Sequence, residues 1–159
     1  MPILKRLKEV LDDAKIPYEV YNHALAYTAQ EIAAKQHVSG NELAKVVMLK
    51  AAEKLVMGVV RGNDKISLRA VEDSLDVRNV WLATEDEFIA RFPECEIGAM
   101  PPFGRVFGLP VYLDRAFAAG DELFFESGTH REEVSMPMAE YIRVERPAIA
   151  PLARVPLAA

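Results

Sequence analysis

Residues 44–60 read AKVVMLKAAEKLVMGVV, and this stretch decides the fold. It contains two runs rich in valine, leucine and methionine, 45–50 and 55–60, joined by a short link that is partly polar. Uninterrupted apolar runs of this length are typical of strands covered on both faces, and a short link between two such runs indicates a β-hairpin. The sequence therefore predicts a hairpin of two largely buried strands at the centre of a sheet.

Weaker signals on both sides of the hairpin predict a mixture of helices and strands. Helical spacing, capping boxes and a helix-starting proline predict helices at 3–15, from 28, around 70–72, at 84–92 and from 137 through 141. Short apolar runs predict strands at 18–21, 80–82, 111–113, 123–125 and 134–136. Because helices and strands do not alternate strictly, we predict an α+β domain with a mixed α/β arrangement.

The length and composition of the chain fit one independently folding domain. The chain has 159 residues, of which 51% are hydrophobic, enough to form a sizeable core. We assign residues 1–146 to this domain and expect the proline-containing residues 147–159 to be a loosely held C-terminal extension. Neither a signal peptide nor a membrane-spanning run is visible, which predicts a cytoplasmic protein without membrane contact.

Charge and residue types restrict the classes of function. The formal net charge of −5 argues against a broadly basic, nucleic-acid-binding surface. All lysines nevertheless lie between residues 5 and 65, so that a local basic face and ordinary solvated charge both stay open. The single cysteine and three scattered histidines lack metal-ligand spacing, and no nucleotide-binding glycine motif or nucleophile elbow occurs. We therefore predict no metal and no cofactor.

Two lysines bracket the first strand of the hairpin. Because side chains alternate along a strand, Lys45 shares a face with residues 47 and 49, whereas Lys50 points to the opposite face. A lysine at such a place either lies at the wet end of the strand or is held in a pocket to meet an anion. The residues alone leave both interpretations open.

The stretch 98–104, GAMPPFG, is too rich in glycine and proline for regular structure and predicts a shaped loop. The loop is either a rigid connection or part of a site. A glycine N–H group can approach a developing oxyanion without a side chain in the way, which makes Gly98 and Gly104 candidate donors. Pro101 has no N–H group and can only shape such a pocket.

Residue types that act as nucleophiles are poorly placed in the sequence. Cys95 lies between Glu94 and Glu96, whose charges would raise the pKa of its thiol, and Ser67 has no base nearby in the sequence. Without a nucleophile or a metal, direct attack by water is the simplest hydrolytic mechanism.

Two histidines are candidate pocket residues. His130 follows Gly128 and a threonine and is either an exposed loop residue or a group that binds a substrate amine or a water molecule. His23 follows the first predicted strand and is a weaker candidate for contact with the pocket or a nucleotide.

Three motifs, taken in order, resemble the YbaK and prolyl-tRNA-synthetase editing-domain family. They are the Ala-Lys leading into the strand at 44–50, the glycine and proline loop at 98–104, and Gly-Thr-His at 128–130 before a strand that ends at residue 136. The similarity extends from the first helix to about Arg143. It implies a mixed, barrel-like β-sheet flanked by helices and an enzyme that hydrolyses the ester between a non-cognate amino acid and the 3′ end of tRNA.

The same resemblance implies roles for individual residues. Lys45 would hold the terminal adenosine phosphate or orient the ester, and Gly98 would contribute to the oxyanion site. The pocket would be lined or shaped by the other members of the motifs, namely His130, Gly128, Gly104 and Pro101, with His23 as a further candidate. The resemblance also implies that the neighbouring ribose hydroxyl assists the attacking water.

Three functional hypotheses follow. The first is a deacylase that acts in trans on aminoacyl-tRNA, with alanine, cysteine or another small amino acid on proline tRNA favoured by analogy alone. The second is a non-catalytic module of the same fold that binds tRNA, a nucleotide or a protein. The third is a regulatory or scaffolding role beside an aminoacyl-tRNA synthetase, because an acidic protein can need a partner to bind tRNA.

Overall fold

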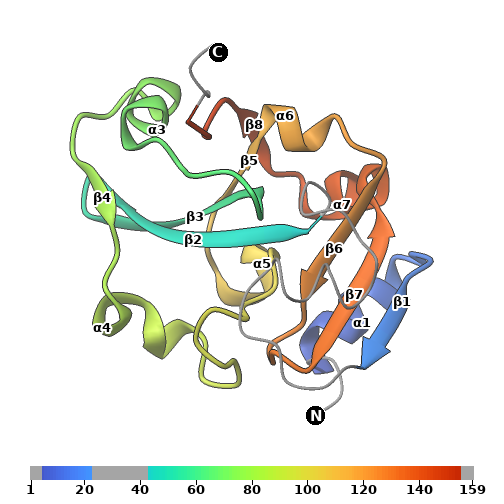
Figure 1. Ribbon diagram of the computed structural model, residues 1–159. Helices are drawn as coiled ribbons and strands as arrows, with labels where there is room; N and C mark the ends of the chain where they lie inside the picture. Colours follow the sequence, from blue (N-terminus) through green and yellow to red (C-terminus); the bar gives the residue numbers. More distant parts are fainter. Residues whose placement is uncertain (1–4, 23–42, 155–159) are drawn as a thin grey trace.

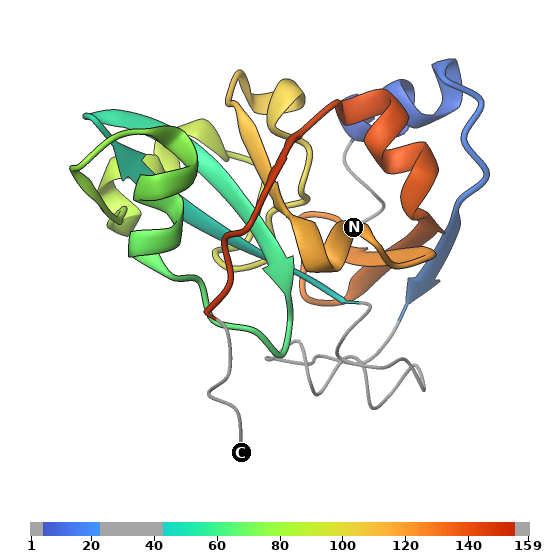
Figure 2. The same cartoon turned by 90° about the horizontal axis from the view of Figure 1, so that it is seen from above.

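The structure is a computed structural model that describes residues 5–22 and 43–154 (Figures 1 and 2). Strands β2 (Ala44–Ala51) and β3 (Lys54–Arg61) form the predicted hairpin, in register from Ala44 opposite Arg61 to Ala51 opposite Lys54. The two residues between the strands have positive φ, as in the tight turns whose twist matches that of a hairpin. The prediction of the hairpin is confirmed.

Two sheets build the domain. The five-stranded sheet has the order β4-β2-β3-β5-β8, with β4 at Val80–Leu82, β5 at Val111–Asp114 and β8 at Ala148–Ala150. The three-stranded antiparallel sheet has the order β1-β7-β6, with β1 at Glu19–Asn22, β6 at Glu122–Glu126 and β7 at Glu132–Pro137. Its three strands lie side by side in Figure 1. The hairpin therefore occupies the centre of the larger sheet, as predicted.

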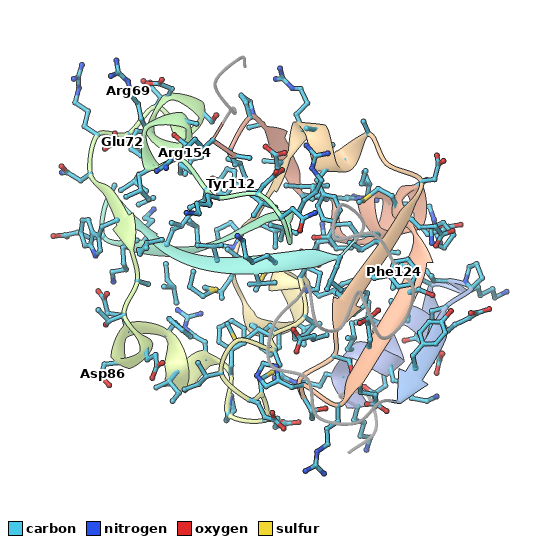
Figure 3. The ribbon with its side chains drawn as sticks, in the orientation of Figure 1. Arg69, Glu72, Asp86, Tyr112, Phe124 and Arg154 are labelled. Atoms are coloured by element: carbon cyan, nitrogen blue, oxygen red, sulfur yellow. The ribbon has the colours of Figure 1, made fainter. Side chains whose placement is uncertain are left out.

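A bridge between Leu43 and Phe124 joins the two sheets immediately before β2 begins. Phe124 lies on β6, on the opposite side of the molecule from Arg69 and Glu72 (Figure 3). The α+β class is confirmed. The strands form two connected sheets, so that the barrel-like sheet is divided rather than continuous.

Short helices flank the sheets, and the longest described one has nine residues. They are α1 (Lys5–Asp13), α3 (Leu68–Leu75), α4 (Glu85–Phe88), the 3₁₀ helix η1 (Ile89–Arg91), α5 (Gly104–Phe107), α6 (Arg115–Ala118) and α7 (Met138–Glu145). The predicted capping box at 84–87 begins α4, and the Ser67 side chain accepts a hydrogen bond from the N–H of Ala70 at the start of α3. The box predicted at residue 28 lies outside the described residues.

The hydrophobic core has two parts, one on each face of the hairpin. Met48 and Met57 belong to the larger cluster, which α1 and α7 complete with side chains such as Leu11 and Tyr141. Leu49 belongs to the smaller cluster, which α3 covers. The alternation of side chains along β2 thus places neighbouring residues in different clusters, and it also directs Lys45 and Lys50 to opposite faces.

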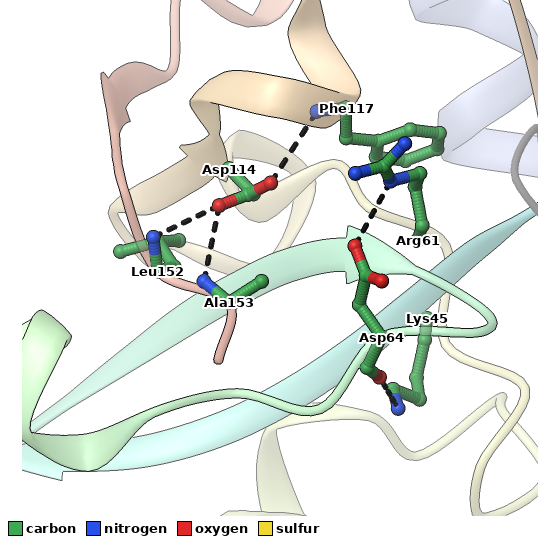
Figure 4. A network of polar contacts seen from close by, with 7 residues as sticks. All are labelled: Lys45, Arg61, Asp64, Asp114, Phe117, Leu152 and Ala153. Carbon is green, nitrogen blue, oxygen red and sulfur yellow. Dashed lines mark hydrogen bonds and ion pairs between the residues drawn. The ribbon is translucent and has the colours of Figure 1, made fainter. Parts of the chain in front are cut away.

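The expectation that the chain after residue 146 is loosely held is wrong for residues 148–154. Strand β8 pairs in parallel with β5, and Leu152 is fully buried. The buried Asp114 carboxylate accepts hydrogen bonds from the N–H groups of Leu152 (2.9 Å) and Ala153 (3.0 Å), and from that of Phe117 at the start of α6 (3.3 Å; Figure 4). The Asp114 carboxylate therefore anchors the residues that follow β8, while β8 itself is held by its pairing with β5.

Among the described residues, no helix is both long and apolar enough to cross a membrane.

Candidate functional site

A pocket of about 340 Å³ lies where the start of β2, the loop after η1 and the end of β6 meet. Its lining residues are Ala44, Lys45, Val46, Ile97, Gly98, Met100, Phe125, Glu126 and His130. This volume is at the small end of the range for small-molecule sites, roughly 300–1,000 Å³. The fold thus brings together Lys45, Gly98 and His130, which are separate candidates in the sequence.

Lys45 is held at this pocket by the segment that follows β3. Its ammonium group donates a hydrogen bond to the backbone carbonyl of Asp64, and the Asp64 carboxylate is paired with Arg61 at 2.9 Å (Figure 4). Burial lowers the pKa of Lys45, and the nearby Asp64 charge opposes that change. Lys45 is therefore a positioned, half-buried cation rather than a mobile one at the wet end of the strand.

Gly98 and Gly128 bring two loops into close contact. The N–H of Glu96 donates to the carbonyl of Gly128 (2.7 Å), and the N–H of Gly128 donates to the carbonyl of Ala99 (2.8 Å). Both glycines have positive φ, 87° at Gly98 and 112° at Gly128, a conformation that disfavours other residues. The loop containing Gly98 is consequently fixed against the end of β6.

His130 strengthens this contact with both of its ring nitrogens. Nε2 lies 3.0 Å from the carbonyl oxygen of Ile97, and Nδ1 lies 2.7 Å from Oε2 of Glu126. The Nδ1 contact with Glu126 is close but does not have the geometry of a hydrogen bond. His130 therefore contacts the Gly98 loop through Nε2 and also lines the pocket.

Glu126 is a pocket residue that the sequence did not predict. Its side chain is only 12% exposed, and burial raises its pKa to about 7; the charge of Glu96 adds to this effect and the contact with His130 opposes it. The available signal was a carboxylate at the end of a predicted strand, four residues before His130. Perturbed acids that line a pocket are frequent in functional sites.

Gly104 and Pro101 do not line this pocket. A Cβ atom on Gly104 would lie 2.3 Å from the carbonyl oxygen of Leu109 and 2.4 Å from Cγ2 of Val111, so that the backbone there approaches its neighbours too closely for any side chain. Pro101 is buried in the loop, and the carbonyl of the following Pro102 accepts a hydrogen bond from Tyr141 (2.6 Å). These residues shape the loop from behind, and His23 lies outside the described residues.

The pocket offers an N–H donor and a cation but no side-chain nucleophile among the described residues. The N–H of Gly98 makes no hydrogen bond within the described part of the chain, which leaves it available to an oxyanion. Burial raises the pKa of the Cys95 thiol to about 11, with a further contribution from Glu94, and Ser67 caps α3. The described residues also contain no cluster of three or more side chains that could hold a metal ion.

Sequence comparison relates this chain to an editing-domain family and to proline–tRNA ligases. The family model of the aminoacyl-tRNA editing domain matches residues 23–144. A proline–tRNA ligase of Bacillus cereus strain G9842 is 25% identical over 108 residues, which cover 68% of this chain but 19% of that enzyme. A second ligase, from strain AH187, is 27% identical over 90 residues, 57% of this chain and 16% of that enzyme. The chain thus spans about a fifth of the length of these relatives.

Solved structures share the fold. The crystal structure of a candidate trans-editing enzyme for prolyl-tRNA synthetase superposes with a TM-score of 0.82 at 20% identity, over 95% of this chain and 96% of that one. A hypothetical protein, APE2540, superposes with a TM-score of 0.83 at 16% identity, over 94% of this chain and 100% of that one. At these identities the likeness concerns the arrangement of the chain.

Proposed function

This chain belongs to the aminoacyl-tRNA editing domain family, and on that premise we propose that it is a cytoplasmic deacylase that hydrolyses mischarged tRNA in trans. Water attacks the carbonyl carbon of the aminoacyl ester, and the bond between that carbon and the ribose oxygen breaks. The products are the free amino acid and a tRNA with its 3′-terminal ribose hydroxyl restored. The hydroxyl oxygen takes one proton of the water.

One observation carries the proposal: a small pocket presents a fixed cation, Lys45, and the N–H of Gly98, and among the described residues it offers neither an acceptor for that N–H nor a side-chain nucleophile. Such a site acts by positioning the ester and by stabilising the charge that develops on its carbonyl oxygen. We assign the oxyanion to the Gly98 N–H and the phosphate of the terminal adenosine to Lys45. The attacking water would be oriented by the neighbouring ribose hydroxyl of the tRNA.

The size of the pocket favours small amino acids. Val46, Met100 and Phe125 supply apolar surface, and the volume leaves little space beside an ester and its ribose. We propose alanine and cysteine on proline tRNA as the first substrates to test, in keeping with the proline–tRNA ligases that this chain resembles. Pocket size discriminates one methylene by only about 1–3 kcal/mol, so that related small amino acids should compete.

The test is release of amino acid from a panel of mischarged tRNAs by the parent protein, by Lys45→Ala and by Lys50→Ala. Lys50 is the matched control because it lies on the same strand, points to the opposite face and pairs with Glu87 at 3.9 Å outside the pocket. We expect the Lys45 variant to lose at least about a hundredfold in kcat/KM, a typical effect of removing an electrostatic contact in a water-excluded site. The Lys50 variant should retain the parent rate.

Absence of hydrolysis above the buffer rate for every ester in the panel would refute the proposal. Salt-sensitive tRNA binding without hydrolysis would then favour a non-catalytic binding module. Equal losses in the two lysine variants would refute the role assigned to Lys45.

A further inference from the structure

We propose that Glu126 is the subsite for the α-ammonium group of the substrate, so that the enzyme accepts aminoacyl esters and rejects esters whose amino group is blocked or absent. The inference rests on the function proposed above and adds a substrate class to it. Free aminoacyl-tRNA carries this cation next to the ester, whereas N-acylated and peptidyl-tRNA do not.

The first support is the position of the carboxylate. Glu126 ends β6 and lines the same pocket as Lys45 and Gly98. Oε2 is fully enclosed and lies 2.7 Å from Nδ1 of His130. Oε1 has no hydrogen-bond partner among the described residues. One oxygen thus contacts His130, and we assign the other to a ligand in the pocket.

The second support is the local concentration of acidic side chains. Glu133 lies directly opposite Glu126 in the register of β6 and β7, and Glu96 lies close enough for its charge to raise the pKa of Glu126. Within the described residues, His130 is the single basic side chain that pairs with any of these three acidic residues. A buried carboxylate is stabilised by a nearby cation, and an incoming ammonium group would supply one.

Lys45 does not pair with the Glu126 carboxylate, although it lines the same pocket. Its ammonium group donates to the carbonyl of Asp64, and no ion pair between Lys45 and Glu126 occurs in the described part of the chain. The two charges therefore belong to separate parts of the pocket, and the carboxylate is left to a cation brought by the ligand.

The third support is the spacing between Glu126 and the proposed oxyanion donor. The imidazole of His130 contacts Glu126 through Nδ1, and its Cε1 lies 3.5 Å from where a Cβ of Gly98 would be. One five-membered ring therefore separates the carboxylate from the Gly98 loop. In an aminoacyl ester the ammonium nitrogen is two bonds from the carbonyl carbon, so that both groups of the substrate can reach their partners together.

The experiment compares alanyl-tRNA with lactyl-tRNA, which has a hydroxyl group in place of the ammonium and is otherwise the same size. Each enzymatic rate is divided by the rate of the same ester in buffer, because the two esters differ in intrinsic reactivity. We expect the parent to prefer alanyl-tRNA by roughly ten- to a hundredfold in kcat/KM, the range for a hydrogen bond to a charged group. Glu126→Gln should reduce that preference to less than about threefold.

A matched variant separates a direct contact from a general change in charge. Glu122 lies on the same strand as Glu126, is exposed and does not line this pocket. Glu122→Gln should therefore keep the parent preference for alanyl-tRNA. The preference of the parent protein for alanyl-tRNA is measured without any variant. The proposal therefore stays testable if Glu126→Gln folds poorly.

Equal corrected kcat/KM values of the parent for the two esters, or an unchanged preference in a folded Glu126→Gln variant, would overturn the inference. Neither result would contradict the proposed deacylase function. If neither ester is hydrolysed, the proposed function fails and binding decides the inference. The probes are then 3′-alanylamido-3′-deoxyadenosine and its lactylamido counterpart, whose amide replaces the ester. Tighter binding of the first by the parent, lost in Glu126→Gln, would support an ammonium subsite; equal binding would refute it.

Discussion

Replacing the buried Glu133 by glutamine should raise the free energy of unfolding relative to that of the parent protein as the pH rises. Glu133 is completely buried between β1 and β6, and neither of its oxygens has a hydrogen-bond partner among the described residues. Burial, with a further contribution from the charge of Glu126, raises the pKa of Glu133 to about 7. Tyr21 lies opposite it on β1, so that no cation faces it from the adjoining strands in the described residues.

The direction of the effect follows from proton binding. The ordinary pKa of this carboxyl group is 4.5, and the folded protein holds its proton up to about 7. Between these values the folded state binds more protons than the unfolded state, so the contribution of Glu133 is fully present below about pH 4.5 and is lost as the pH rises through 7. Since one pKa unit corresponds to about 1.4 kcal/mol, the loss approaches about 3 kcal/mol above pH 8.

The assay is urea unfolding of the parent and of Glu133→Gln at pH 5.0, 6.5 and 8.0, with Glu122→Gln as the exposed control on the neighbouring strand. The informative quantity is how the difference in unfolding free energy between variant and parent changes with pH. A buried glutamine has its own unsatisfied groups, and that cost is nearly independent of pH. We expect the difference to rise by about 2–3 kcal/mol in favour of Glu133→Gln between pH 5.0 and 8.0.

A constant difference across this range would refute the reasoning, because it would mean that Glu133 is ionised equally in the folded and unfolded states. A difference that falls with rising pH would mean that the carboxylate is stabilised by a cation. The control variant should show a change of less than about 0.5 kcal/mol, as exposed substitutions usually do.

Two further substitutions test packing around the site. Gly104→Ala should lower the unfolding free energy by about 3 kcal/mol or more in urea titrations, because the added Cβ would overlap the backbone, whereas Gly120→Ala, with its closest neighbour at 3.4 Å, should change it by less than about 1 kcal/mol. Equal effects would contradict the close approach at Gly104. Asp114→Ala should cost about 3 kcal/mol, because it leaves two buried N–H groups and one half-buried N–H group without an acceptor, and limited proteolysis should then cleave the chain near β8. A protease-resistant C-terminal strand in that variant would show that packing alone holds it.

The central hairpin could be predicted because its signal is local. The apolar runs of 44–60 are long enough to require burial on both faces, and the register follows from the short turn. The same alternation of side chains predicts that Lys45 and Lys50 lie on opposite faces of the strand. Strand β8 could not be predicted, because Ala148–Ala150 is short and flanked by prolines, and its pairing depends on β5 and on the buried Asp114.

The site could be predicted only in part, for a physical reason. Glycine is required both where an N–H group must meet a ligand, as proposed for Gly98, and where two backbones touch, as at Gly104, and the sequence does not distinguish the two cases. In the sequence, Glu126 is an ordinary polar residue at the end of a predicted strand. Its burial depends on the 96–99 loop, which the hydrogen bonds of Gly128 bring against it from a distant part of the sequence.

On the proposed function, the two charged groups of the pocket together define an orientation for the substrate. The 3′ end of an aminoacyl-tRNA has a phosphate on one side of the ester and an ammonium group on the other. In the proposed roles, Lys45 matches the first charge and Glu126 the second, and each also has a partner in the protein, Asp64 or His130. A reversed substrate would place like charges together in a poorly solvated pocket, which costs several kcal/mol, so the residues proposed to bind the ester would also decide which way it lies.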